Sequence, residues 1–326
     1  MARLNMVQAI DQALQQEMER DDTVIVLGED VGKDGGVFRV TEGLVERFGE
    51  NRVIDTPLAE SAILGFSIGA AIAGYRPVAE MQFSGFSYPA FDQMVSHAGR
   101  MRKRSQGTWT VPLVMRTPYG GGIRALEHHS ESMEAIWAHI PGIKTVIPSD
   151  PHDAKGLLIA AIRDPDPVVF YEPKRVYRAI KMEVPEESYE IPLGKAQVVR
   201  EGSDVTLIAW GAQVRTCKAA AEQMSEEKRG EVEVVDVRTL TPFDRETVIG
   251  SVRKTGRAVV VSEEPPTASF TSEIMAQIME HAILKLEAPA RRVTGFDTPT
   301  PLAKLEDWFL PDVDLVIRET LKTLEF

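Results

Sequence analysis

Short runs of β-branched and other apolar residues alternate with amphipathic segments along almost the whole chain. Strands are predicted at residues 24–27, 52–55, 77–83, 111–116, 143–150, 167–173, 204–210, 232–237, 257–264 and 291–296. Helices are predicted between them, among others at 41–48, 152–163, 212–224, 245–254 and 269–284. Such alternation is typical of parallel sheets with helices on both faces, so the expected fold class is α/β.

The length of the chain and one irregular stretch predict two domains. At 326 residues the chain exceeds what one hydrophobic core usually organises. Residues 174–194 lack a clear period and carry Pro185 and Pro192 among charged residues, which is typical of a linker. We therefore expect one α/β domain at 1–180, a linker at 181–196 and a second α/β domain at 197–326.

Composition excludes several classes of function. The net charge of -12 argues against a nucleic-acid binder that follows the phosphate backbone. The single cysteine, Cys217, excludes an internal disulfide and a cysteine-based zinc site. The N-terminal residues follow helical spacing and contain no continuous apolar run of the kind found in signal peptides. The expected location is cytoplasmic, or an equivalent reducing compartment.

Residues 55–74 form the most apolar stretch of the chain. Thr56 is a suitable cap and Pro57 a suitable first residue for a helix. Because the segment is apolar almost all round, we expect a buried helix, too short to span a membrane. The expected helix carries one carboxyl, Glu60, in its first turn. Glu60 is either a surface group favoured by the helix dipole or a carboxyl poised for proton transfer in an apolar pocket.

The loops after the predicted strands carry the other candidate groups. The glycine-rich loop after residue 27 is not a phosphate loop, because Lys33 is one residue too close to Gly28 and no Ser or Thr follows. No GxGxxG dinucleotide fingerprint is present. Glu29 and Asp30 nevertheless lie at the end of a strand, where open parallel sheets bind ligands. Flexible turns are the alternative interpretation.

Two further segments have both a structural and a functional interpretation. The aromatic residues Phe86, Tyr88 and Phe91 are either core or a platform for a flat ring. Three glycines precede His128 and His129, which are either surface histidines or site residues on a functional loop. HExxH spacing is missing, so zinc is not expected. The residues alone predict a site at the strand ends and do not name a reaction.

Several motifs together identify a family. They are GEDVG, DTPLAES, FSGFSYPAFDQ, GGG followed by HHS, DAKGLL with AIRDPDP, GKAQVVREG and VRTLTPFD. The whole chain thereby resembles the β subunit of the thiamine-diphosphate-dependent 2-oxo acid dehydrogenase component, of pyruvate or branched-chain type. The resemblance implies a pyrimidine-binding domain followed by a transketolase C-terminal-like domain. It also implies an oxidoreductase that decarboxylates a 2-oxo acid and acylates lipoyl-lysine.

The resemblance implies specific cofactors and partners. In this family thiamine diphosphate lies between an α and a β subunit of an α2β2 heterotetramer. The α subunit holds Mg2+ and the diphosphate through a GDG motif, which this chain lacks. The chain alone should therefore be inactive. The C-terminal domain should dock the dihydrolipoyl acyltransferase core near Phe326.

The resemblance also assigns roles residue by residue. Glu60 matches the glutamate that hydrogen-bonds the aminopyrimidine ring nitrogen, and Phe86 matches the aromatic residue that packs on that ring. Leu58 lies beside the same ring. His129 matches the histidine that steers proton transfer during acyl transfer. Glu29 matches an acidic residue in the network between the two active sites.

A potassium site and one departure from the family complete the expectations. Some members bind potassium through carbonyls and a carboxylate, at positions that match Leu113, Ala161, Ile162, Asp164 and Asp166. A proline-containing turn at 164–167 is the alternative interpretation of the last two. His128 stands where several relatives carry Gln, and is expected to be a spectator.

Two other functions are compatible with parts of the sequence. One is a non-catalytic scaffold subunit that only docks the acyltransferase core. The other is a nicotinamide-dependent dehydrogenase on a doubly wound sheet, which the missing dinucleotide fingerprint disfavours. The preferred 2-oxo acid is not predicted, because much of that pocket is expected to come from the partner chain.

Overall fold

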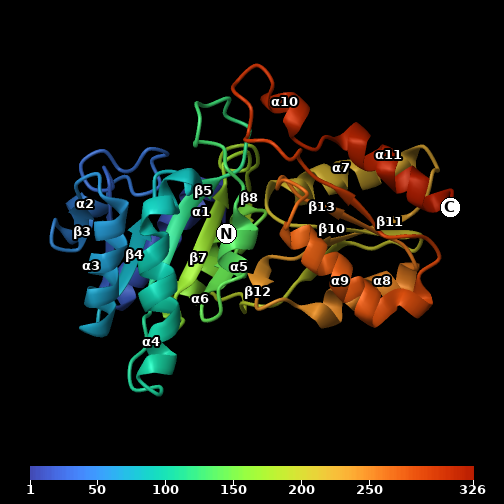
Figure 1. The fold of residues 1–326 in the computed structure, drawn as a ribbon. Helices are drawn as coiled ribbons and strands as arrows, with labels where there is room; N and C mark the ends of the chain where they lie inside the picture. The colour runs from blue at the N-terminus through green and yellow to red at the C-terminus, as the bar shows by residue number, and fades with distance from the viewer.

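The computed structural model describes residues 1–326 and contains two α/β units side by side (Figure 1). The N-terminal unit is built on a seven-stranded sheet of order β12-β6-β7-β5-β4-β2-β3. The C-terminal unit is built on a five-stranded sheet of order β14-β13-β10-β11-β9. The α/β fold class predicted from the alternation of strands and helices is confirmed.

Six strands of the N-terminal sheet run parallel, and all of them except the short β3 are buried along most of their length. They are β2 (Val24–Gly28), β3 (Val53–Asp55), β4 (Arg76–Glu80), β5 (Val114–Tyr119), β6 (Lys144–Val146) and β7 (Val168–Pro173). The seventh strand, β12 (Thr239–Thr241), comes from the second half of the chain and pairs antiparallel with β6. The second half of the chain therefore completes the edge of the first sheet.

Helices cover both faces of this sheet, as the buried strands require. They are α1 (Met6–Arg20), α2 (Leu44–Phe48), α3 (Glu60–Ile72), the 3-10 helix η1 (Ser84–Ala90), the π-helix η2 (Gln93–Ala98), α4 (Gly99–Arg104), α5 (Glu134–Ala138) and α6 (Pro151–Arg163). Helix α1 begins with a complete capping box, in which Asn5 and Gln8 each bond the other's main-chain N–H.

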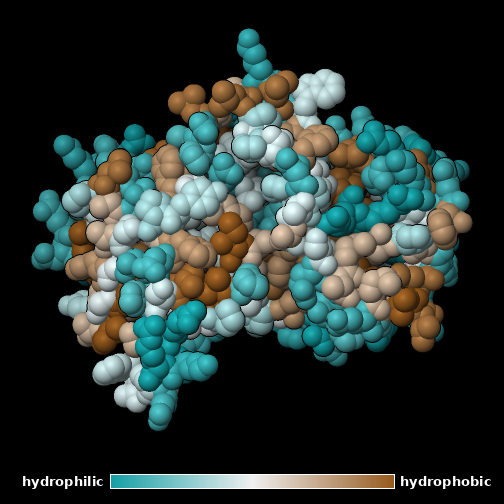
Figure 2. Space-filling model, in the orientation of Figure 1, coloured by the Kyte–Doolittle hydropathy of each residue, from teal (hydrophilic) through white to brown (hydrophobic).

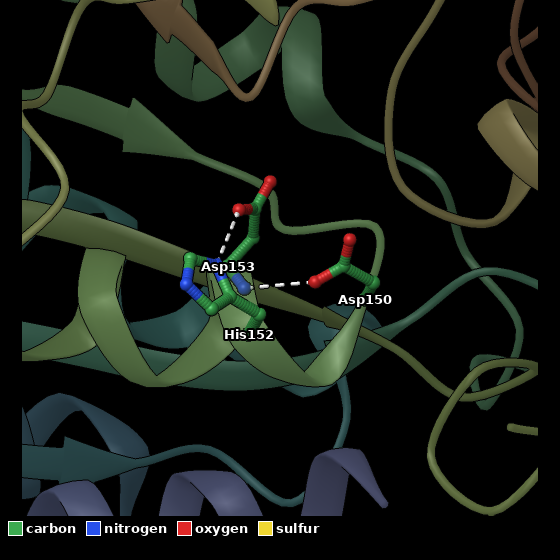
Figure 3. Close-up of side chains that lie close together, drawn as sticks. All are labelled: Asp150, His152 and Asp153. Carbon is green, nitrogen blue, oxygen red and sulfur yellow. Dashed lines mark hydrogen bonds and ion pairs between the residues drawn. The ribbon is translucent and has the colours of Figure 1, made fainter. Parts of the chain in front are cut away.

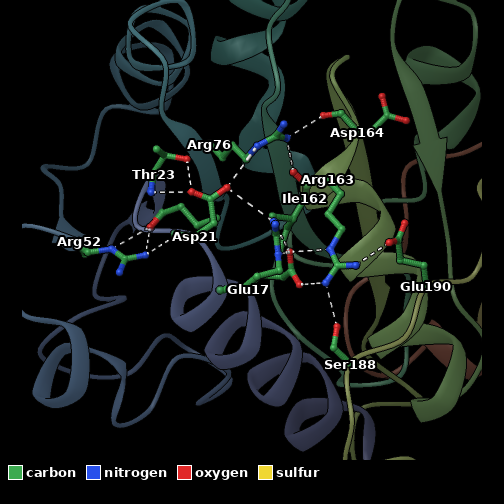
Figure 4. A network of polar contacts seen from close by, with 12 residues as sticks. Glu17, Asp21, Thr23, Arg52, Arg76, Ile162, Arg163, Asp164, Ser188 and Glu190 are labelled. Atoms are coloured by element: carbon green, nitrogen blue, oxygen red, sulfur yellow. Dashed lines mark hydrogen bonds and ion pairs between the residues drawn. The ribbon is translucent and has the colours of Figure 1, made fainter.

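A polar network fastens α1 to the end of α6 (Figure 4). The buried Glu17 carboxylate of α1 accepts hydrogen bonds from Arg163 of α6 at 2.6 and 3.0 Å. Arg163 also binds Glu190, in the segment between the two units, at 2.6 Å. One arginine thus connects a helix of the first unit to the predicted linker.

The predicted linker contains one strand. Strand β8 (Met182–Val184) pairs antiparallel with β1 (Ala2–Leu4) at the N-terminus. The segment is therefore held against the N-terminal unit by main-chain hydrogen bonds and by Lys155, whose ammonium donates to the Pro185 carbonyl at 2.6 Å.

The C-terminal sheet is parallel except for its edge strand β9 (Gln197–Arg200), which the sequence analysis missed. Its other strands are β10 (Val205–Ala209), β11 (Val232–Asp236), β13 (Ala258–Val261) and β14 (Arg291–Val293). Its helices are α7 (Ala212–Glu226), α8 (Arg245–Thr255), α9 (Phe270–Ala282), the 3-10 turn η3 (Ile283–Lys285), α10 (Glu306–Phe309) and α11 (Val313–Leu324). One apolar cluster joins the units, with Trp137 on one side and Trp210 and Phe270 on the other.

Helix α3 differs from its prediction in two ways. It begins at Glu60 rather than Pro57, because Thr56 still extends the pairing of β3 and donates its N–H to the Gly28 carbonyl. It is also buried on one face only, through residues such as Ile63 and Leu64. Phe66 on the opposite face is 57% exposed, so the expectation of a helix buried all round is wrong for the chain alone. Figure 1 shows α3 at the outer side of the unit.

A buried ion network crosses the middle of the N-terminal sheet. Arg116 of β5 binds Glu172 of β7 at 2.6 and 3.0 Å and Glu80 of β4 at 2.8 Å. Tyr177 donates its hydroxyl to Glu172 at 2.6 Å. All these side chains are buried, so Arg116 compensates two carboxylates that have lost their water. No helix of the structure is both long and apolar enough to span a bilayer.

Removing Arg116 should destabilise the fold strongly. Arg116→Leu leaves two buried carboxylates without a cation, and we expect the free energy of unfolding to fall by about 3–5 kcal/mol. The matched control is Arg102→Leu, which removes an exposed ion pair with Asp166 and should cost about 0–1 kcal/mol. Urea unfolding of both variants tests this expectation, and equal midpoints would contradict it.

Candidate functional site

The predicted site residues come together at the carboxyl edge of the N-terminal sheet, which is where open parallel sheets place ligands. Glu29 directly follows β2, Glu60 begins the helix after β3, and Phe86 lies in the 3-10 helix after β4. The loop with His129 follows β5, and Figure 1 shows that the loops after β2 and β5 lie at the same edge. Four separate connections thus contribute one side chain each.

Glu29 and Glu60 form a pair of neighbouring carboxyls. Glu29 is buried, whereas Glu60 is half-buried. Burial, followed by the negative charges of Glu60 and Asp30, raises the pKa of Glu29. A carboxyl with a raised pKa at a strand end is a candidate for acid–base chemistry.

The start of α3 is fastened on one side and open on the other. The Ser61 hydroxyl donates to the Pro89 carbonyl, which ties this helix start to η1. Leu58, just before the helix, is 79% exposed. The apolar pocket expected around Glu60 is therefore only partly formed by this chain.

Phe83, Phe86 and His129 form a compact ring cluster. The ring centroids of Phe83 and Phe86 lie 5.4 Å apart, and the His129 imidazole lies 4.4 Å from Phe83 and 5.0 Å from Phe86. Phe86 remains partly exposed at this cluster. The structure therefore brings together two predicted site residues, Phe86 and His129, and adds Phe83, which the sequence analysis did not single out.

His129 has a defined ring orientation. Its Nδ1 lies 2.8 Å from the Glu127 carbonyl, and because a carbonyl only accepts, Nδ1 carries the proton. In the neutral ring Nε2 is therefore the nitrogen that can accept a proton. His128 points elsewhere: it is exposed, has a φ of 65° and lies 4.0 Å from Glu131.

The histidine loop rests directly on Gly85 of η1. A Cβ atom at position 85 would overlap the main-chain oxygen of His128. Ser84 additionally donates its hydroxyl to the Glu131 carbonyl at 2.8 Å. The contact explains why a glycine lies inside the aromatic motif, which sequence periodicity does not reveal.

Two glutamates of the C-terminal unit hold the three-glycine loop. The Glu263 carboxylate accepts from the Gly121 N–H at 3.0 Å. Glu306 of α10 accepts from the Gly122 N–H at 2.6 Å and from the Ser130 hydroxyl at 3.3 Å. We call Glu263 and Glu306 the carboxylate clamp. The clamp fixes both ends of the loop that carries His129.

Glycine is required at positions 120 and 122 by the backbone conformation and by close neighbours. Gly120 and Gly122 have φ of 76° and 102°, which favours glycine. A Cβ at Gly120 would also overlap the Glu263 carboxylate, and one at Gly122 would overlap the Arg175 side chain. The sequence analysis anticipated positive dihedrals here but not the partners that impose them.

Two more carboxyls are buried where the units meet. Glu134 of α5 accepts from the Trp210 indole N–H at 3.1 Å. Glu264 accepts from the N–H groups of Ala135 and Phe270 at 2.9 and 3.0 Å. Burial, then the charge of Glu264, raises the pKa of Glu134 well above its usual range, and burial raises that of Glu264 to about 7.

The predicted potassium ligands lie at one turn, but their acidic groups already face cations. Lys144 binds the Asp164 carboxylate at 2.6 Å, and Arg102 binds Asp166 at 2.7 Å. The carbonyls of Leu113, Ala161 and Ile162 each accept a hydrogen bond within the chain. Both carboxylates are therefore already compensated by cations of this chain, so the potassium site stays a prediction and no step depends on it.

Two aspartates and a histidine also lie close enough together to hold a metal ion, but each makes a contact that stabilises the fold (Figure 3). They are Asp150, His152 and Asp153. Asp150 caps α6 by accepting from the Asp153 N–H at 2.8 Å. Arg238 binds the Asp153 carboxylate at 2.5 and 2.6 Å, and the His152 ring stacks on Tyr189. These residues join α6 to the C-terminal unit, because Arg238 lies between β11 and β12.

Large apolar side chains are exposed around the histidine loop. In Figure 2 apolar residues gather at the top of the molecule, over the loop after β5 and the segment around α10. The exposed large apolar residues of these segments are Ile123, Leu126, Leu302, Leu305 and Trp308. An apolar surface of this kind beside a candidate site is typical of a protein–protein contact.

Comparison with known proteins shows that the chain consists of two transketolase-type domains. The transketolase pyrimidine-binding domain model matches residues 2–180, and the transketolase C-terminal domain model matches residues 194–316. A solved split-gene transketolase, an inactive β4 tetramer, has the same fold with a TM-score of 0.80 over 99% of both chains, at 22% identity.

More similar relatives identify the family. The chain is 52% identical to the pyruvate dehydrogenase E1 component subunit beta of Acholeplasma laidlawii, over 97% of this chain and 96% of that one. It is 51% identical to the Bacillus subtilis protein of the same name over the full length of both. The chain therefore belongs to the family of β subunits of the 2-oxo acid dehydrogenase component, and the resemblance seen in the motifs is confirmed.

Gly85→Ala should loosen the histidine loop. The new methyl group would overlap the His128 carbonyl, so residues 126–131 must move. We expect faster amide hydrogen exchange in that segment. Gly250→Ala is the control, because a Cβ there meets no atom within 4 Å. Unchanged exchange at 126–131 in Gly85→Ala would contradict this interpretation.

The buried carboxyls predict a pH dependence of stability. Glu134 and Glu264 bind a proton more tightly in the folded chain, so their contribution to stability is full below their ordinary pKa of 4.5. The contribution is lost as pH rises, for Glu264 through a pKa of about 7 and for Glu134 through a pKa well above its usual range. Glu134→Gln, which stays neutral, should gain stability relative to wild type as pH rises from about 5 to about 8. Urea unfolding at several pH values measures the difference. The exposed Glu127→Gln is the control, and parallel curves for wild type and Glu134→Gln would refute the prediction.

Proposed function

We propose that this chain is the β subunit of an enzyme that, together with an α subunit, oxidatively decarboxylates a 2-oxo acid and transfers the acyl group to lipoyl-lysine. The observation that supports it most directly is the placement of Glu60, Phe86 and His129 at one sheet edge. These are the three positions to which the family resemblance assigns proton transfer and ring packing. Relatives of about 50% identity over the full length support the same function.

The proposed cofactor is thiamine diphosphate, and the groups present fit its pyrimidine end. The half-buried Glu60 offers a carboxyl, the partly exposed Phe86 a ring face, and Leu58 an apolar side chain. When bound, the cofactor supplies an electron sink for decarboxylation. The diphosphate and Mg2+ are assigned to the α subunit, because this chain has no phosphate-binding loop.

The chain's own residues would move protons at two places. Glu60 would hold a proton at the ring nitrogen of the pyrimidine, which requires a carboxyl that is partly removed from water. The neighbouring Glu29 carboxyl, whose pKa is raised by burial and by the charge of Glu60, would lie beside it at the same sheet edge. His129, with its Nδ1 proton on the Glu127 carbonyl, would exchange a proton through Nε2 during acyl transfer.

The open surfaces of the chain support the proposed assembly. The exposed face of α3, with Phe66 and Ile72, and the exposed Leu58 would be covered in an α2β2 heterotetramer. Phe326 at the C-terminus is 75% exposed, which suits the proposed docking of the acyltransferase core. A cytoplasmic location is part of the same proposal, and the substrate is pyruvate or a branched-chain 2-oxo acid.

Glu60→Gln should abolish most activity of the assembled enzyme. An amide cannot hold the proton at the ring nitrogen, and loss of such a group typically costs about 10²–10⁴-fold in rate. The measurement is 2-oxo acid decarboxylation with an artificial electron acceptor, with thiamine diphosphate and Mg2+ present. Pyruvate and a branched 2-oxo acid are tried in turn, which ranks the substrates.

Three controls make this measurement decisive. Exposed Glu50→Gln should retain full activity, and the unmodified chain without its α subunit should have none. Assembly of each variant with the α subunit is checked by size. Unchanged turnover in assembled Glu60→Gln would favour the scaffold alternative, and activity of the chain alone would refute the shared site.

A further inference from the structure

Lys174 lies behind the ring cluster, and the sequence analysis did not single it out. It directly follows β7, and its side chain is almost fully buried. Its ammonium donates to the main-chain oxygen of His129 and lies 5.3 Å from the centroid of the Phe83 ring. A single cation therefore contacts both the histidine's backbone and the ring against which its imidazole packs.

This double contact restrains the imidazole from two sides. The Phe83 ring lies 4.4 Å from the His129 ring, so its position determines where the imidazole can rest. The carbonyl of His129 determines where its Cα lies. With Nδ1 held by the Glu127 carbonyl, the Lys174 contacts leave the ring little freedom to turn.

Lys174 retains its charge although burial opposes it. Burial lowers its pKa to about 8, and the carboxylates of Glu263, Glu306 and Glu131 act in the opposite direction. The ammonium is therefore the main form at neutral pH. No carboxylate makes an ion pair with it within 4.0 Å, so the His129 carbonyl and the Phe83 ring are its close partners. A buried cation without an ion pair is costly for stability alone.

A second buried lysine shows what a purely structural arrangement looks like. The Lys155 ammonium donates to Gln12 at 2.8 Å and to the carbonyls of Pro185 and Glu187 at 2.6 and 2.9 Å. These contacts join α6 to the segment after β8, away from the ring cluster. Lys155 therefore provides a matched control for burial and charge.

We propose that Lys174 is a positioning residue for His129, which fixes the imidazole for transfer of the acyl group to lipoyl-lysine. The inference deepens the proposed function and rests on it, because it presupposes that His129 acts in that transfer. Lys174 itself touches neither substrate nor cofactor in this proposal. Its effect must therefore depend on the presence of the imidazole.

A double-mutant cycle in the assembled α2β2 enzyme tests this dependence. Lys174→Met should lower kcat for acylation of a lipoyl domain on the order of ten- to hundredfold, since small misplacements of a reacting group have such effects. KM for the 2-oxo acid and decarboxylation with an artificial acceptor should change less than about twofold. In a His129→Ala background the same substitution should have no further effect.

The remaining variants exclude a general loss of structure. Lys155→Met should leave acylation of the lipoyl domain unchanged. Lys174→Arg, which keeps the charge, should recover part of the rate. Lys174→Gln keeps one donor and replaces Lys174→Met if that variant does not assemble with the α subunit. Equal effects of Lys174→Met with and without the imidazole would overturn the proposal.

A measurement on the full chain separates this proposal from the function on which it rests. Amide hydrogen exchange at residues 126–131 should quicken in Lys174→Met and not in Lys155→Met, whatever the reaction. If exchange quickens but His129→Ala is fully active, the assigned role of His129 fails. If His129→Ala is impaired while Lys174→Met changes neither acylation nor exchange, the positioning role fails.

Discussion

The carboxylate clamp is the interaction on which the rest of the site depends. Glu263 and Glu306 lie in the C-terminal unit, yet they accept the main-chain N–H groups of the three-glycine loop in the N-terminal unit. A run of glycines has more conformational freedom to lose than any other sequence, so it orders only if strong partners hold it. Charge-assisted hydrogen bonds to buried carboxylates are such partners. The histidine that follows the loop is thus placed by the far domain as well as by its own.

The site is a composite of rigid and open parts. The clamp carboxylates and Phe83 are buried, whereas Phe86, His129 and Glu60 are only half-buried and Leu58 is exposed beside the open side of α3. This difference matches a division of labour between two chains. In the proposed assembly, the imidazole that must keep one orientation is fixed within this subunit, and the groups that would meet the cofactor lie where a second chain would cover them. An exposed apolar helix face is costly for an isolated soluble chain and becomes understandable as an interface.

The sequence predicted what depends on local patterns and missed what depends on distant partners. Alternation of strands and helices predicted the fold class, a strand end pointed to Glu29, and the first turn of the apolar helix pointed to Glu60. The start of α3 was misplaced because the pairing of Thr56 with Gly28 across the sheet overrides the local Thr-Pro signal. Neither clamp residue could be found from the loop itself, since Glu263 is 142 residues from the glycine it binds. Lys174 appears in sequence only as a lysine after an apolar strand.

Strand β12 has a consequence for the order in which the protein can form during synthesis. This strand completes the edge of the N-terminal sheet beside β6, but its residues come from position 239 onward. A nascent chain that has emerged only as far as the linker therefore exposes an unpaired edge at β6. Such an edge is a template for pairing with other chains, and the emerging subunit would need protection until most of the second unit has left the ribosome.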